Sequence, residues 1–277
     1  MTTSKKRKAS QNLKLTGRLL DPVLPNATVR QRYEKALDKL VEEMHESIMY
    51  WVRAEYKKTG LAQDALPSPA KLMQKAIKSL TKRWLKRFDG VADKLASQFI
   101  NASQKSSDVG FHNAMKKAGF TVEFSMSEEV KNALEGSLAE NVGLIKSIAE
   151  KHLSSVETIV MQSVSRGFDM QYLADNLQEQ YGVTKRRAAF IARDQSAKAN
   201  AVIITARQKS IGINHAIWRH SGGGKVPRPS HLKAGRDRLM FDLSKGAFID
   251  GEFIFPGQLI NCRCSQQAVM PWEMTQK

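Results

Sequence analysis

The chain has 277 residues, of which 42% are hydrophobic, so it can form one large domain or two smaller ones with buried cores. Its 44 Lys and Arg residues against 27 Asp and Glu residues give a net charge of +17, which favours negatively charged partners, nucleic acid above all. Two cysteines, Cys262 and Cys264, exclude a disulfide-based secreted scaffold. The basic N-terminus is not followed by an apolar segment and the apolar runs are short, so we expect neither a secretory signal nor a membrane span.

Residues 1–25 are expected to form a basic, flexible arm. Pro22 and Pro25 interrupt any helix there. A cationic run stands near the start of the chain, made of Lys5, Lys6, Arg7 and Lys8. The arm is either a solvated tail or a segment that reaches a phosphate backbone.

The first half of a helical body follows the arm. Apolar residues at three- and four-residue spacings predict a helix over 26–59, ended by Gly60. Ser68 and Pro69 are typical of the cap and first position of a second helix, which we expect to end near Phe88, and a third covers residues 91–118. The second helix has a basic stripe that is either a solvated face or a phosphate-binding face. Its candidate DNA contacts are Lys82, Arg83, Lys86 and Arg87.

The second half of the body contains further helices. Ser125 and Glu128 form a capping-box pattern for a helix that continues to Ile148, and another helical stretch covers 156–165. A helix over 170–181 is expected to stop at Gly182, and a separate long helix capped by Thr184 then extends to Ser210. Three basic residues near the start of this helix belong to the packing scaffold or contact DNA; they are Lys185, Arg186 and Arg187.

The helical pattern ends at Gly212. Beyond it, short apolar segments, such as those around Trp218 and Phe253, alternate with Gly- and Pro-containing turns, which is typical of short strands. The predicted fold is therefore mainly α with a small α+β or β-rich C-terminal module. The expected domains are an arm (1–25), a helical body (26–183), and a module that combines the long helix with the β-rich part (184–277).

Three motifs occur in order along the last third of the chain. They are a helix containing Arg193, a strand containing Trp218, and a closing Asn261-Cys262-Arg263-Cys264 segment. In this order they resemble the Mu F-like head-morphogenesis family, the minor head proteins of tailed bacteriophages. Many members have an additional Cys-x-x-Cys pair after the Trp strand, where this chain has Arg228 and His231.

The resemblance implies a structural protein and not an enzyme. Such a protein would lie inside the capsid or at the portal vertex of the virion, and in the host cytoplasm during assembly. Its implied partners are the portal protein, capsid or scaffold proteins, and double-stranded DNA bound through phosphates without sequence readout, with no membrane partner. Its implied role is in procapsid assembly, DNA packaging or DNA ejection.

The cysteines and histidines of the module raise the question of a metal. If Cys262 and Cys264 lie on a strand, both point to one side, and His231 and His220 could complete a tetrahedral zinc site. Alternatively, the cysteines are small buried hydrophobic residues and His231 is a hydrogen-bonded turn residue. The sequence leaves a structural zinc and this metal-free arrangement open.

Two other functions are compatible with the sequence. A nuclease or toxin-like enzyme could use His220 and His231 with Arg228 and Ser230, although carboxylates for a two-metal site are sparse. The acidic residues between positions 185 and 245 are Asp194, Asp237 and Asp242. A non-specific DNA-binding protein of the nucleoid type is allowed by composition alone.

Overall fold

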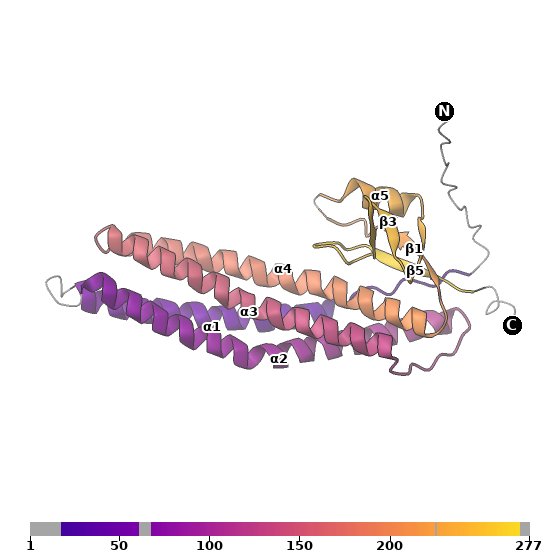
Figure 1. Ribbon diagram of the computed structural model, residues 1–277, viewed down its shortest axis with the longest axis horizontal. Helices are drawn as coiled ribbons and strands as arrows, with labels where there is room; N and C mark the ends of the chain where they lie inside the picture. Colours follow the sequence, from indigo (N-terminus) through magenta and orange to yellow (C-terminus); the bar gives the residue numbers. More distant parts are fainter. Residues whose placement is uncertain (1–17, 61–67, 225, 272–277) are drawn as a thin grey trace, which may run out of the picture.

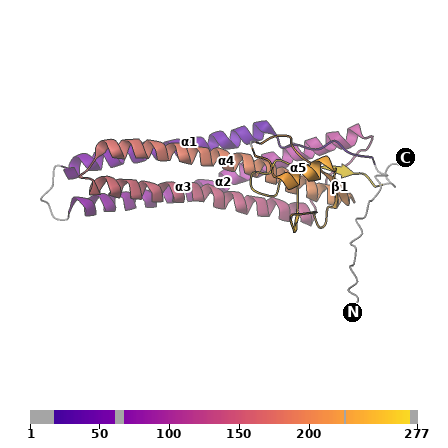
Figure 2. The same ribbon diagram turned by 90° about the horizontal axis from the view of Figure 1, so that it is seen from above.

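The protein is an elongated helical bundle with a small module at one end. The computed structural model describes residues 18–60, 68–224 and 226–271. In this part of the chain each of four long helices runs antiparallel to the next, and the first packs against both the second and the fourth (Figures 1 and 2). The longest has 49 residues, about 74 Å at 1.5 Å per residue. The helices are α1 (Ala27–Gly60), α2 (Pro69–Lys117), α3 (Glu128–Ser165) and α4 (Met170–Ser210).

The bundle is held together by apolar stripes on the helices. In α1 the buried residues recur every three or four positions, so that one face of the helix enters the core and the other meets solvent. They include Tyr33, Leu37, Val41, Met44, Ile48 and Val52. This confirms the first predicted helix, which the structure describes over Ala27–Gly60. No helix within the described ranges is both long enough and apolar enough to cross a membrane.

Two predicted helix breaks are wrong. Helix α2 continues through Gly90 as one helix, and α4 continues through Gly182. A glycine inside a helix costs about 1 kcal/mol relative to alanine, and tertiary packing on both sides of the glycine outweighs this cost. Residues 128–165 likewise form one helix, where we expected two stretches. The expected domain boundary between residues 183 and 184 therefore falls inside α4.

Two predicted caps are also corrected. Thr184 is buried inside α4, where its hydroxyl donates to the Gln180 carbonyl oxygen (2.9 Å), so it does not begin a helix. Helix α3 is capped by Ser127, whose Oγ accepts from the Val130 amide (3.4 Å), and not by Ser125. The reason is register: Ser127 stands directly before the first helical residue, as a cap must. Ser68 does precede α2, although its side chain makes no cap hydrogen bond.

The C-terminal module is a small antiparallel arrangement beside the ends of α2 and α4 (Figure 1). Three strands form a sheet in the order β2-β1-β5, and two more form a hairpin. The strands are β1 (His215–Arg219), β2 (Met240–Asp242), β3 (Ala247–Ile249), β4 (Glu252–Ile254) and β5 (Ser265–Val269). The expected strand-rich module is confirmed, but α5 (Pro229–Arg236) was not expected from the sequence.

Residues 18–25, expected to belong to a flexible arm, are instead packed against the module and the bundle. Leu19 bridges Val269, and the Leu20 amide donates to the Ala268 carbonyl oxygen (3.0 Å), so this segment lies at the edge of the sheet. Leu20 is buried in the module's core. Backbone pairing and apolar burial explain why it is held. The cationic run at Lys5 to Lys8 lies outside the described residues.

Candidate functional site

The three sequence motifs meet where α4 contacts the module. Asp194, next to Arg193 on α4, is buried, and its Oδ1 accepts a short hydrogen bond from the Asn261 amide. Asn261 has a positive φ of 59°, a conformation that asparagine tolerates better than most residues. Lys198 lies 3.3 Å from the other Asp194 oxygen. Asp194 therefore fixes the Asn-Cys-Arg-Cys segment to the long helix.

A buried cluster of sulfur and nitrogen atoms lies directly behind this joint. Nδ1 of His231, on α5, is 3.5 Å from Cys262 Sγ and 3.7 Å from Cys264 Sγ. Both cysteines are free thiols in the turn before β5, so the strand geometry considered for a metal site does not apply. The fully buried Trp218 ring meets the His231 imidazole edge-on, with centroids 4.9 Å apart. Three of the four proposed metal ligands thus come together.

His220 is not part of this cluster. The group of metal-ligating atoms within 4.8 Å of one another contains His231, Cys262 and Cys264 among the described residues. His220 stands just after β1, and its Nδ1 accepts from the Gly222 amide (3.0 Å). The turn that contains Gly222 therefore orients the His220 ring separately from the three clustered residues.

The two thiols have opposite pKa shifts. A hydrogen bond from Cys264, against the opposing effect of burial, lowers the pKa of Cys262, and the Gly257 amide assists by donating to its Sγ (3.4 Å). The same pairing and burial raise the pKa of the Cys264 thiol. One of the two thiols therefore loses its proton easily, and the proton that remains is shared between the two sulfurs.

Arginines surround the open side of the cluster. A cavity of about 580 Å³ is lined by His231 and both cysteines and also by Arg193, Arg228 and Arg263. Arg228 donates to the Ile260 carbonyl oxygen (3.0 Å), which fixes its position at the rim. Among the described residues, no acidic side chain lines this cavity and none forms an ion pair with these arginines. The cavity is therefore electropositive.

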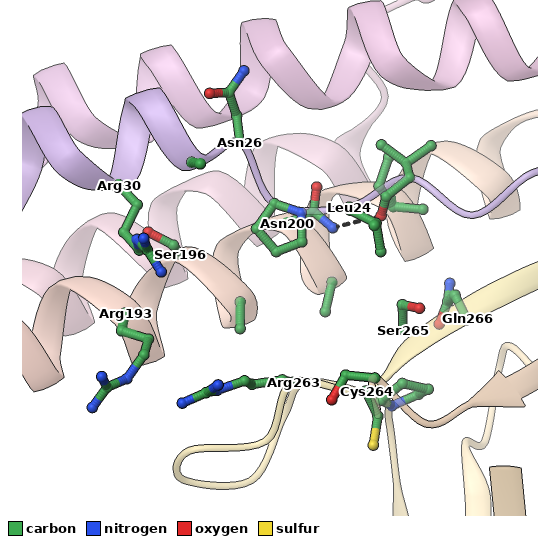
Figure 3. A pocket seen from close by; sticks show the side chains of 18 residues that line it. Leu24, Asn26, Arg30, Arg193, Ser196, Asn200, Arg263, Cys264, Ser265 and Gln266 are labelled. Atoms are coloured by element: carbon green, nitrogen blue, oxygen red, sulfur yellow. Dashed lines mark hydrogen bonds between the residues drawn. The ribbon is translucent and has the colours of Figure 1, made fainter. Parts of the chain in front are cut away.

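A second, smaller cavity is also lined by Arg193 and Arg263. It measures about 280 Å³ and lies between α4, the start of α1 and the turn before β5. Figure 3 shows Arg193 and Arg263 directed toward the same space between α4 and that turn. Arg30 on α1 also lines it, and its buried Nε lacks a hydrogen-bond partner among the described residues. Nothing in the sequence around Arg30 marked it, because the turn of α1 on which it stands resembles the rest of the helix.

The candidate DNA contacts on α2 divide into two kinds. Arg83 donates to Ser47 Oγ (3.0 Å) and Arg87 pairs with Glu43 (3.2 Å), so both hold α2 to α1. Lys82 and Lys86 are exposed and form no ion pair with another described residue. The two lysines are thus the members of this stripe that remain available to a partner.

The basic residues of α4 divide in the same way. Arg187 donates to Ser147 Oγ (2.9 Å) on α3, and the Lys185 ammonium lies over the Tyr181 ring at 5.5 Å. Arg186 is exposed. Arg187 thus packs against α3, and Arg186 is the most accessible charge of this stretch.

The residues of the enzymatic alternative are only partly assembled. His220, Arg228 and His231 line the same cavity. Ser230, however, donates to Asp250 Oδ2 (2.6 Å), and the His231 ring is buried against the thiols. The sequence reasoning also missed Asp194 as the anchor of the joint, although a lone acid in a basic stretch was a usable signal.

Comparison with known proteins supports the family resemblance that the three sequence motifs indicated. Residues 154–267 match the family model described as phage Mu protein F like protein. This part of the chain is phage Mu F-like. The matched range begins inside α3 and ends in β5, so the phage Mu F-like part includes α4 and the whole cluster. The family model that matches this part of the chain describes a phage protein.

A second comparison gives a bacterial relative. A protein of Haemophilus influenzae described as uncharacterized is 35% identical over 144 residues, which is 52% of this chain and 31% of that protein. The chain thus spans about a third of the relative's length. No solved structure matches.

Proposed function

We propose that the protein is a structural minor head protein of a tailed phage that docks on the portal and contacts packaged DNA. The observation that supports this most directly is the phage Mu F-like match over the segment that joins α4 to the module. Asp194 and the packed N-terminal segment make that joint rigid, as a docking element requires. The protein would act inside the capsid or at the portal vertex.

The charge of the chain supports the DNA contact. A net charge of +17 attracts phosphates without reading sequence, and Lys82, Lys86 and Arg186 are exposed on the bundle. Contacts of this kind position a protein on DNA but do not select a site. The proposed role is structural and not catalytic. It lies in head assembly, DNA packaging or DNA ejection.

Portal docking is tested by a pull-down of the purified chain with the portal protein of the same phage or prophage genome. The measurement is made at low and at high salt, with and without nuclease. We expect binding that persists at high salt and after nuclease treatment, because a packed protein interface is not screened as phosphate contacts are. Binding that disappears under either condition would leave only a general DNA-binding protein.

DNA contact is tested with the double variant Lys82→Glu/Lys86→Glu. If both lysines meet phosphates, DNA affinity falls and the slope of log affinity against log salt decreases by about two. The matched control is Lys131→Glu/Lys151→Glu on α3, which makes the same charge change at exposed positions. Equal losses in the two variants would show that net charge, and not this stripe, determines binding.

A further inference from the structure

The arrangement of His231, Cys262 and Cys264 has the dimensions of a metal site. The His231 Nδ1 lies 3.5 and 3.7 Å from the two sulfurs. A tetrahedral zinc ion with Zn–S of about 2.3 Å and Zn–N of about 2.0 Å separates such atoms by about 3.5 Å. His231 Nδ1 thus already stands at the separations from both sulfurs that one ion would impose, and the three ligand atoms all lie within 4.8 Å of one another.

The ligand chemistry selects the metal. Two thiolates and one imidazole are soft and borderline donors, which suit zinc and not magnesium or calcium. No carboxylate belongs to the cluster within the described part of the chain. All three residues are buried, and the Trp218 ring covers one side of His231. Such a site is pre-organised, because α5 and the turn before β5 position the donors before any ion arrives.

The fourth coordination position of such an ion would determine whether the site can bind a further ligand. Structural zinc sites have four protein ligands, whereas sites with three leave a position for another molecule. All three residues line the cavity of about 580 Å³ that Arg193, Arg228 and Arg263 also line. With Trp218 on one side of His231, the cavity is the open approach to the ion. Guanidinium groups there favour an oxyanion.

We propose that His231, Cys262 and Cys264 bind one zinc ion whose fourth position opens into this arginine-lined cavity and accepts a phosphate-type oxyanion. The proposal does not depend on portal docking, because it rests on the geometry of the cluster and of the cavity between the module and α4. It assigns Arg228 and Arg263 to holding the anion beside the metal. It also gives a reason for three arginines that form no ion pair with another described residue to line one cavity, since a bound anion neutralises them.

Metal content tests the first half of the proposal. The full chain, purified without chelators or a metal-affinity tag, is analysed for zinc per chain by mass spectrometry. We expect about one zinc per chain, its loss in His231→Asn and in Cys262→Ser/Cys264→Ser, and its retention in His220→Ala. Helical circular dichroism of each variant separates loss of a ligand from loss of the fold. A folded parent that takes up no zinc after dialysis against zinc would overturn the site, and zinc loss in His220→Ala would overturn the three-ligand arrangement.

Cobalt spectroscopy tests the open position. In cobalt-loaded protein, thiolate-to-metal absorption reports the two sulfurs, and the visible bands respond to a change of fourth ligand. Inorganic phosphate should shift the visible bands saturably in the parent. Arg263→Ala should weaken this response about tenfold, the effect of one charge-assisted hydrogen bond. Acetate is the control for carboxylates: a response to acetate without one to phosphate, or no response to either, would overturn the proposed ligand.

Discussion

At the scale of single residues, the joint between α4 and the module depends on one buried carboxylate. Asp194 accepts from the Asn261 amide and lies beside Lys198. Replacing it with alanine leaves that amide without its partner and removes a charge-assisted hydrogen bond. We expect Asp194→Ala to lower the free energy of unfolding by about 2 kcal/mol, measured by urea denaturation.

Two variants control this prediction. Asp194→Asn keeps an acceptor but not the charge, so its loss should be intermediate. Asp237→Ala removes an exposed carboxylate that pairs with exposed Arg236, and its effect should stay within about 0.5 kcal/mol. If Asp194→Ala is as mild as Asp237→Ala, the joint does not depend on Asp194.

A buried histidine makes the stability of the bundle dependent on pH. His152 is almost fully buried between helices, and its Nδ1 is 2.8 Å from Thr184 Oγ1. Burial, assisted by nearby His45, lowers the pKa of His152 from about 6.5 to about 4. Between these values the unfolded chain binds a proton that the folded chain does not. Stability should therefore fall as pH decreases from about 6.5 to 4, by up to about 3 kcal/mol from this group.

The measurement is urea denaturation at pH 7 and at pH 4.5. His152→Leu removes the titrating group, so its free energy of unfolding should decrease less between these pH values than that of the parent. His112→Leu, at an exposed position on α2, should retain the parent's pH dependence. An equal decrease in the parent and in His152→Leu would assign the acid sensitivity to other groups.

At the scale of elements, the continuity of α4 determines how alanine at Gly182 should change the stability of the protein. A helix that ended at Gly182 and one that continues through it predict changes of opposite sign. If Gly182 ended a helix in the left-handed conformation, alanine there would destabilise the protein. Inside a continuous helix, alanine lowers the entropy of the unfolded chain and fits, since the added carbon meets only the flexible Arg186 side chain at 3.4 Å. We expect Gly182→Ala to stabilise the protein by about 0.5–1 kcal/mol in thermal or urea unfolding.

Gly212 provides the matched control. It follows α4 with a φ of +80°, where an alanine side chain is strained. Gly212→Ala should therefore destabilise the protein by about 1 kcal/mol. Destabilisation by Gly182→Ala would mean that α4 is interrupted there in solution.

These glycines show what the sequence could and could not predict. The apolar spacing around Leu37 or Ile191 is a local pattern, and it predicted the helices correctly. Whether a helix continues through Gly90 or Gly182 depends on packing against other helices, which no local pattern contains. Helix α5 was missed for the related reason that Pro227 and Pro229 resemble turn residues, although Pro229 stands at a helix start.

The candidate site was predicted to a similar degree. The cysteine pair and His231 were identified because residues that bind metals are chemically distinctive, and the structure brings them together. His220 was included on type alone, but a local hydrogen bond to the Gly222 amide orients it separately. Arg30 was missed because it comes from α1, more than two hundred residues before Arg263, and only the fold makes them neighbours.

At the scale of the whole molecule, the module has its own hydrophobic cluster, distinct from the bundle core, and side chains from two bundle helices are part of it. Phe111 and Met115 of α2 and Ile204 of α4 are buried among module residues, and Leu20 enters the same cluster from the N-terminal segment. Because α2 and α4 contribute residues to both clusters, we expect the bundle and the module to unfold together. The test compares helical circular dichroism, which reports the bundle, with Trp218 fluorescence in a variant whose other tryptophans are phenylalanine. The two urea transitions should coincide.

Leu20→Ala tests whether the N-terminal segment contributes to this coupling. Leu20 is 1% exposed, and truncating such a leucine costs about 2–5 kcal/mol. If the molecule is one cooperative unit, the circular dichroism and fluorescence transitions should both move to lower urea by the same amount. Leu24→Ala, in the same segment but 62% exposed, should move neither appreciably. A shift confined to the fluorescence transition would show that Leu20 stabilises the module alone, and the joint at Asp194 would then be a hinge between independently folding parts.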